Sequence, residues 1–93
     1  MRALMFAIAV LTAGPSHAAC TQPESPACAL RTGPFAGARD FDECRKLMLT
    51  YRDDIETYAV CVKPQSAADE KAARDAYHAA WSQFNRRARE TPE

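Results

Sequence analysis

The sequence predicts an all-α fold: an antiparallel two-helix hairpin with a disulfide-stapled, Pro/Gly-rich N-terminal arm, preceded by a signal peptide. Three observations predict it. They are an apolar stripe that repeats every seven residues, a Pro64 that separates two helical segments, and four cysteines in a chain of 93 residues. So short a chain holds one small domain, which packing alone stabilises poorly.

Residues 1–18 have the order of a secretory signal peptide. Arg2 supplies a positive charge, an apolar run extends from Ala3 to Ala13, and the Gly14-Pro15 pair then breaks the run. The run has 11 residues, whereas a helix needs about 20 to cross a membrane. We therefore predict cleavage and no stable membrane span.

Small residues at Ser16 and Ala18 fit cleavage after Ala18, and the alternatives are cleavage after Ala19 or acylation of Cys20. The chain carries 12 basic and 12 acidic side chains, and cleavage removes only one charged residue. The product is thus nearly neutral, and it attracts neither nucleic acid nor an anionic membrane surface. We predict a periplasmic or secreted protein with no nucleic-acid partner.

Residues 19–39 are rich in Pro, Gly, Ala, Ser and Thr, so we expect an extended arm with no helix of useful length. Four cysteines follow the signal peptide: Cys20, Cys28, Cys44 and Cys61. An even number of cysteines in a short exported chain indicates two disulfides. Their spacing includes no Cys-x-x-Cys pair, which argues against a zinc site or a thioredoxin-like redox centre.

The predicted hairpin covers residues 40–90, and its first helix covers about 41–62. We expect Asp40 to cap this helix, with Glu43 reaching back as in a capping box. Apolar residues recur alternately three and four positions apart, as in a coiled coil: Phe41, Cys44, Met48, Tyr51, Ile55, Tyr58 and Val62.

The second helix is predicted over about 67–89, with Ser66 as its cap followed three residues later by Asp69. Its predicted apolar face comprises Ala72, Ala73, Ala76, Tyr77, Ala80, Trp81, Phe84 and Ala88. Ion pairs are expected at i,i+4 spacing: Asp42–Lys46, Arg52–Glu56, Glu70–Arg74 and Lys71–Asp75. The last turns should end in three solvated cations: Arg86, Arg87 and Arg89.

A short connection makes the two helices spatial neighbours, so residues whose numbers sum to about 130 should face each other. This register pairs Tyr58 with Ala72 and Ala73, Ile55 with Ala76, Tyr51 with Ala80, and Leu47 and Met48 with Trp81 and Phe84. Large residues thus meet small ones near the turn, but meet large ones at the open end. The open end should therefore splay and receive the arm or a partner.

Helix length limits how the cysteines can pair. Cys44 and Cys61 lie about 25 Å apart on one helix, and Cys20 and Cys28 span about 26 Å of extended arm. An antiparallel arm would therefore join Cys28 to Cys44 and Cys20 to Cys61, the pairing that we favour. Joining Cys20 to Cys44 and Cys28 to Cys61 would require the arm to double back, and a local Cys20–Cys28 bond would leave the other two unpaired.

Two segments carry a family resemblance: Tyr58-Ala-Val-Cys61 and Ala80-Trp-Ser-Gln-Phe84-Asn85-Arg86. They resemble uncharacterised small exported (periplasmic) bacterial proteins in which a Tyr-x-x-Cys helix precedes an Ala-rich helix that ends in Phe-Asn. The resemblance spans about residues 41–89. It implies a periplasmic address and a helical hairpin, and it carries no known activity.

We predict no catalytic, cofactor-binding or metal-binding residues. With His17 removed, His78 is the single imidazole, and no nucleophile or paired carboxylate accompanies it in the sequence. The Asp53-Asp54 pair is interpreted as solvated. Four aromatic residues at helical spacing are interpreted as core rather than as a ligand groove: Tyr51, Tyr58, Tyr77 and Trp81.

These features favour a noncatalytic interaction or accessory protein of the bacterial envelope, not an enzyme. Its helices would bind a helix of a protein partner or of a second copy, which predicts an exposed apolar strip with Leu49 and Val60 as candidates. The alternative is a small-ligand carrier or enzyme that uses the aromatic end around Trp81 and Phe84, which predicts a closed pocket with converging polar groups.

Overall fold

The computed structural model of the protein describes residues 20–92. This range contains three helices, α1 (Ala27–Leu30), α2 (Ala38–Val62) and α3 (Ala67–Glu90), and no strand, which confirms the all-α class. None of the three helices is long and apolar enough to cross a membrane. The predicted signal peptide, residues 1–18, lies outside the described residues.

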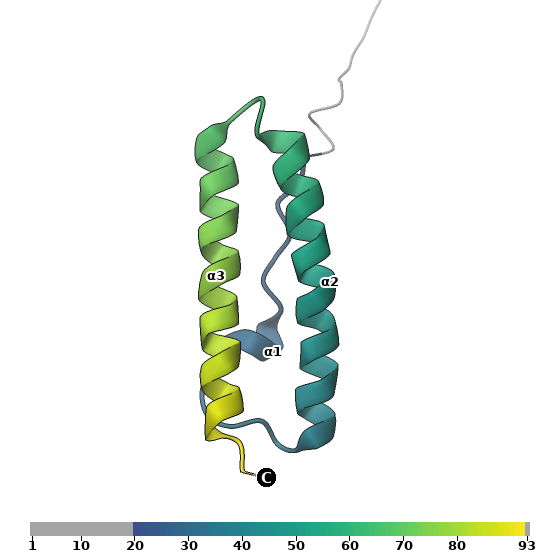
Figure 1. The fold of residues 1–93 in the computed structure, drawn as a ribbon, viewed down its shortest axis with the longest axis vertical. Helices are drawn as coiled ribbons and strands as arrows, with labels where there is room; N and C mark the ends of the chain where they lie inside the picture. The colour runs from purple at the N-terminus through teal and green to yellow at the C-terminus, as the bar shows by residue number, and fades with distance from the viewer. Residues whose placement is uncertain (1–19, 93) are drawn as a thin grey trace, which may run out of the picture.

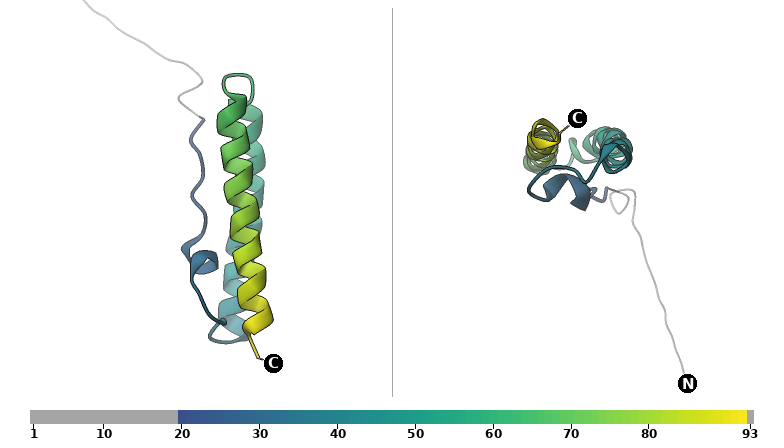
Figure 2. Two further views of the ribbon diagram at one scale, coloured as in Figure 1. Left: turned by 90° about the vertical axis from the view of Figure 1, so that its left-hand side faces the viewer. Right: turned by 90° about the horizontal axis from the view of Figure 1, so that it is seen from below.

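Helices α2 and α3 lie side by side, and residues 63–66 connect their adjacent ends (Figure 1). The arm, defined from here on as residues 20–37, runs along the helix pair and contains α1. Figure 2 shows the arm on one side of the plane of the two helices. The arm therefore covers one face of the pair only.

The start of α2 differs from the prediction. The helix begins at Ala38 instead of about 41, Gly37 precedes it, and no side chain caps it. The predicted cap at Asp40 is therefore wrong, since Asp40 lies in the first turn, where its negative charge complements the helix dipole. The arm contains the single turn of α1, which has 4 residues and is shorter than the helix of useful length that the prediction excluded.

The seven-residue repeat produces the core. Six of its seven members are buried and Phe41 is half-buried, as expected for the inner stripe of a paired helix. The remaining buried members of the core come from the arm and from α3: Ala29, Phe35, Ala73, Ala80 and Phe84. The core is thus built from three segments, of which the arm is one.

Helix α3 begins as predicted, because the Ser66 Oγ accepts a hydrogen bond from the Asp69 N–H (3.1 Å). The predicted ion pairs of this helix form, with Glu70–Arg74 at 3.1 Å and Lys71–Asp75 at 2.7 Å. The two pairs predicted for α2 are not among the ion pairs of residues 20–92; Arg52 instead contacts Asp53, and Glu56 contacts Arg74. Ala72, predicted on the apolar face, is exposed.

Contacts between α2 and α3 define how the helices face each other. Glu56 and Arg74 lie 3.2 Å apart, and the rings of Tyr51 and Tyr77 have centroids 5.8 Å apart. Hydrogen bonds from Arg74 to Glu56 and Glu70 raise the pKa of the Arg74 guanidinium. One part of the predicted register is wrong: Leu47 is 54% exposed and does not enter the core with Met48.

The open end of the pair receives the arm. The Phe35 ring lies 5.5 Å from the ring of Phe41 and 5.3 Å from that of Phe84, measured between centroids. Phe41 and Phe84 themselves approach to 5.4 Å. Phe35 of the arm thus packs against both of the large residues that the two helices bring together there.

Ala80 is 0% exposed, so a substitution at this position tests how closely the helices pack. Replacing Ala80→Trp should lower the free energy of unfolding by about 2–3 kcal/mol, since the larger side chain must displace packed neighbours. Ala79→Trp is the matched control, because Ala79 is exposed on the same helix. Urea unfolding of both variants measures the difference, and equal stability would contradict the packing described above.

Candidate functional site

Two disulfides attach the arm to α2. They join Cys20 to Cys61 and Cys28 to Cys44, with Cα–Cα separations of 5.6 and 5.8 Å. These are the two pairs that the arm length favours. Gln65, in the connection between α2 and α3, donates from its Nε2 to the Cys20 Sγ (3.6 Å) and the Cys61 carbonyl (3.4 Å). The arm is therefore held at two points along α2.

Arg87 attaches the arm to α3, which corrects the prediction that it is a solvated helix end. Its side chain is 7% exposed. The guanidinium donates to the carbonyls of Gly33 (2.8 Å), Pro34 (3.1 Å) and Cys28, and it lies 4.1 Å from the centroid of the Phe35 ring. A guanidinium is planar, so its edge can donate to several carbonyls while its face stacks on a ring, and a lysine ammonium has no such flat face.

The arm curves around Arg87 because of a glycine. Gly33 has a φ of +88°, in the left-handed region that a residue with a side chain rarely adopts. This turn after α1 aims the Gly33 carbonyl at the guanidinium. Beyond it, the Phe35 N–H donates to the Thr91 Oγ1 (2.8 Å), and that hydroxyl donates to the Arg87 carbonyl (2.7 Å). The end of α3 is thereby tied to the arm.

Two further hydrogen bonds hold the arm beside the helices. The hydroxyls of Ser25 and Tyr51 lie 3.0 Å apart, and the Gln83 Nε2 donates to the Arg31 carbonyl (2.7 Å). The arm thus contacts α2 near its middle and α3 near its end. A segment fixed in this way forms a permanent wall beside α2.

A second heptad stripe, called here the flank stripe, runs along α2 beside this wall. Each of its members directly precedes a member of the buried seven-residue repeat that runs from Phe41 to Val62. The members are Asp40, Glu43, Leu47, Thr50, Asp54, Thr57 and Cys61. All its members are exposed except Cys61, which is half-buried. Because a seven-residue repeat drifts by only about 20° per heptad, the stripe stays on one side of α2.

The flank stripe lines three depressions between α2 and the arm. Their volumes are about 420, 420 and 150 Å³ in order from the connection toward the start of α2. Asp54 lines both the first and the second, and Leu47 lines both the second and the third. Successive depressions therefore share a residue and lie next to one another, and the three together are called here the flank groove.

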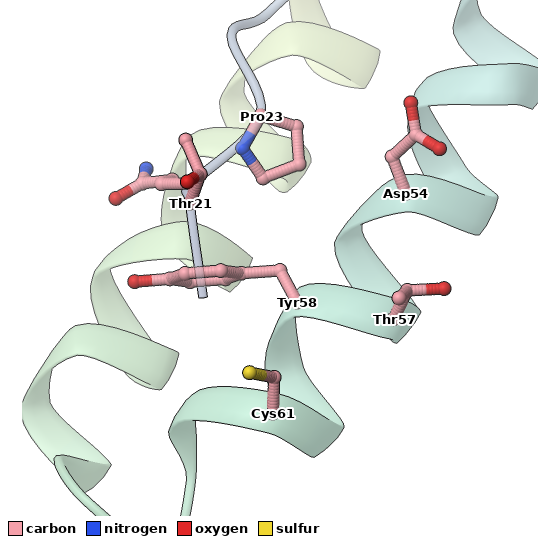
Figure 3. Close-up of a pocket in the computed structure, with 7 residues that line it drawn as sticks. Thr21, Pro23, Asp54, Thr57, Tyr58 and Cys61 are labelled. Carbon is pink, nitrogen blue, oxygen red and sulfur yellow. The ribbon is translucent and has the colours of Figure 1, made fainter. Parts of the chain in front are cut away.

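Figure 3 shows the depression nearest the connection. Thr21 and Pro23 come from the arm, and the ring of Tyr58 extends from α2 beneath Thr21. Asp54 and Thr57 stand on the same side of α2, one turn apart (Figure 3). An aromatic floor with threonine and carboxylate groups at its rim suits side chains that have both an apolar stem and a polar end.

The rim of the flank groove is acidic. Four carboxylates line it: Glu24, Asp40, Glu43 and Asp54. None of them makes an ion pair with another part of residues 20–92. Two cations also line it, and of these Arg87 directs its donors to backbone carbonyls, which leaves Arg31 as the exposed cation. The groove therefore presents an excess of negative charge.

The predicted apolar strip lies elsewhere. Val60 is 76% exposed and Leu49 is half-buried, and neither lines the flank groove. Leu47, which the sequence analysis placed in the core, is instead the exposed apolar side chain of the groove. Sequence reasoning missed the flank stripe because its charged and threonine members look like an ordinary solvated helix flank.

The histidine, the acidic pair and the aromatic residues singled out in the sequence lie in the environments that were predicted for them. His78 is exposed, with its ring 5.4 Å from that of Tyr77, and Asp53 and Asp54 are both exposed. Tyr51 and Tyr58 belong to the buried core, and Tyr77 and Trp81 pack against it. Within residues 20–92 no three potential metal ligands gather at one place.

The aromatic end is filled by the protein's own side chains. The Phe84 ring lies 5.1 Å from the ring of Trp81 and 5.3 Å from that of Phe35, measured between centroids. Among the described residues, the Trp81 Nε1 is the buried side-chain nitrogen that lacks a hydrogen-bond acceptor. At the tip of this end, an open depression of about 550 Å³ lies between Gly37, Phe41, Ala88 and Pro92.

No protein-family model, no curated protein and no solved structure matches this chain.

Proposed function

We propose that this chain is a noncatalytic exported accessory protein of the bacterial envelope, in which a disulfide-braced helical hairpin binds another protein through its flank groove. The observation that carries the proposal is Leu47. This large apolar side chain is 54% exposed at the middle of a groove whose walls are fixed by two disulfides and by Arg87. An apolar centre surrounded by a polar rim is the usual composition of a protein interface.

The disulfides and the predicted signal peptide support export from the cytosol. Disulfides form and persist in oxidising compartments and are rare in the cytosol. All four cysteines of the described residues are paired. The resemblance of Tyr58-Ala-Val-Cys61 and the Phe-Asn helix end to small exported bacterial proteins points to the same compartment, with the bacterial periplasm as our first choice.

Site-specific photocrosslinking tests the proposal. A photoreactive p-benzoylphenylalanine placed at Leu47 should form crosslinks to one envelope protein in irradiated cells, because this position lies in the flank groove. The same group at Val60 is the matched control, since Val60 is more exposed on the same helix but lies outside the groove. The captured protein is identified by mass spectrometry, and the crosslink is repeated with purified components.

Two results would contradict the proposal. One is the absence of any crosslink from position 47 in cells that produce the protein at its natural level. The other is an identical set of products from positions 47 and 60, because contact at both positions would mean random collision rather than docking in the groove.

The alternative function is a small-ligand carrier at the aromatic end. The observation that favours it is the unpartnered Trp81 Nε1, which can donate to a ligand. Against it, Phe35, Phe41 and Phe84 pack on one another at this end. Trp81 fluorescence distinguishes the two functions, because a ligand at this end should quench it and a protein bound in the flank groove should not.

A further inference from the structure

We propose that the flank groove takes a cationic amphipathic helix of the partner protein, with an apolar residue packed on Leu47 and Lys or Arg side chains on either side of it. This inference rests on the proposed function, and it adds the chemistry and the shape of the segment that docks.

Charge is the first argument. Four carboxylates outside the groove make ion pairs: Asp53 with Arg52, Asp75 with Lys71, and Glu56 and Glu70, which share Arg74. The four carboxylates that line the groove have no such neighbour among residues 20–92. The groove thus gathers four unpaired carboxylates around Arg31, the one exposed cation among its lining residues, and a cationic partner would complete the pairs there.

The spacing of the flank stripe is the second argument. Asp40 and Glu43 stand at one end, Asp54 stands 11 residues beyond Glu43, and Leu47 and Thr50 lie between them. At 1.5 Å per residue, Glu43 and Asp54 are about 16 Å apart along the helix. A partner helix whose own stripe repeats every seven residues can follow this pattern along its whole length, with apolar residues at the centre and cations on both sides.

The path of the arm is the third argument. The arm forms a wall along one side of the groove from Thr21 to Arg31, and it is held there by both disulfides. Pro23 and Pro26 lie in this stretch and lack backbone N–H groups, so the arm is a poor edge for adding a β-strand. A helix that lies in the groove, with α2 on one side and the arm on the other, does not need free backbone N–H groups on the arm.

A designed peptide tests the inference with the oxidised protein. The probe is an Ala-rich helical peptide of about 22 residues whose heptad stripe carries two central leucines with lysines on either side. The matched peptide has glutamate at every lysine position. Fluorescence anisotropy should show binding of the lysine peptide that weakens at least tenfold when NaCl rises from about 50 to about 500 mM, because added salt screens the charges. The glutamate peptide should not bind.

Paired variants of the protein locate the binding. Leu47→Ala and Asp54→Asn should each raise the Kd for the lysine peptide at least fivefold. Val60→Ala and Asp53→Asn are the matched controls, since each replaces the same kind of residue outside the groove, and their Kd should stay within about twofold of the unchanged protein. Circular dichroism of all four variants checks that the fold is kept.

Three results would overturn the inference: equal binding of the two peptides, an equal loss of affinity in the control variants, or a dimer in light scattering that Leu47→Ala converts to a monomer. The last would mean that a second copy occupies the groove. A specific crosslink from position 47 without lysine-peptide binding would reject the cationic helix and keep the proposed function. If the lysine peptide binds in a way that depends on Leu47 and Asp54, but position 47 gives no crosslink in cells, the groove does bind cationic helices and the proposed function is rejected.

Discussion

Replacing Arg87→Ala should lower the free energy of unfolding by about 3–4 kcal/mol, although the chain keeps both disulfides. Hydrogen bonds from a charged donor contribute about 1.5–3 kcal/mol each, and the Arg87 guanidinium donates to three backbone carbonyls while stacking on Phe35. Truncation leaves these carbonyls without their donor in a half-buried site. Urea unfolding of the oxidised variant measures the loss.

Arg86→Ala is the matched control, because Arg86 lies next along the same helix and is exposed. We expect this control to change stability by less than about 0.5 kcal/mol. Hydrogen exchange adds a local measurement: the Phe35 amide, bonded to Thr91, should exchange faster in Arg87→Ala than in Arg86→Ala. Equal unfolding midpoints for the two variants would mean that Arg87 does not hold the arm.

Removing one disulfide should cost about as much as removing Arg87. Cys20 and Cys61 are 41 residues apart in sequence, and Cys28 and Cys44 are 16 apart. Loop-closure entropy predicts a loss of about 4 kcal/mol for the first bond and about 3 kcal/mol for the second. Each loss is a large part of the roughly 4–11 kcal/mol that a domain of this size has in total. The two double-alanine variants, compared by urea unfolding, measure these losses.

The two variants should also differ in how they affect the groove. Loss of the Cys20–Cys61 bond frees the arm beside Tyr58, where Thr21 and Pro23 line the first depression. Loss of the Cys28–Cys44 bond removes a buried contact of the core, since Cys44 is 2% exposed. A stability loss below about 1 kcal/mol in both variants would show that the disulfides contribute little to the stability of this fold.

The class of the fold and its core follow from the sequence because their signal is periodic. The stripe from Phe41 to Val62 repeats every seven residues, and the Ser66 cap and Pro64 mark the boundary between the helices. The start of α2 was harder to place. Phe35 packs on Phe41 and so fixes the chain just before the helix, and α2 then begins at Ala38, before the first cap-like residue.

Arg87 shows why the arm could not be predicted in detail. Its neighbours Arg86 and Arg89 make it look like part of a solvated end, yet it stands seven residues after Ala80 and fourteen after Ala73, both buried. This spacing places residue 87 on the buried face. What the sequence does not reveal is that three carbonyls of the arm meet the guanidinium there, because they depend on the turn at Gly33.

The flank groove needs two segments that are distant in sequence. The flank stripe of α2 is visible in the sequence as a heptad, but its mixture of Asp, Glu and Thr with a single Leu is also that of a solvated helix face. Only the arm, placed beside Leu47 and Asp54 by the two disulfides, turns this face into a groove. The proposed binding surface is thus a product of tertiary structure.

The central claim is that the two disulfides hold the helices together. Thermal unfolding, monitored by circular dichroism at 222 nm before and after reduction of both disulfides, tests it most directly. Two long helices bury too little apolar surface to stay folded without the disulfides. We therefore expect the oxidised protein to unfold cooperatively and the reduced protein to have lost most of its helix at 25 °C. Full helicity and an unchanged Tm after reduction would contradict the account.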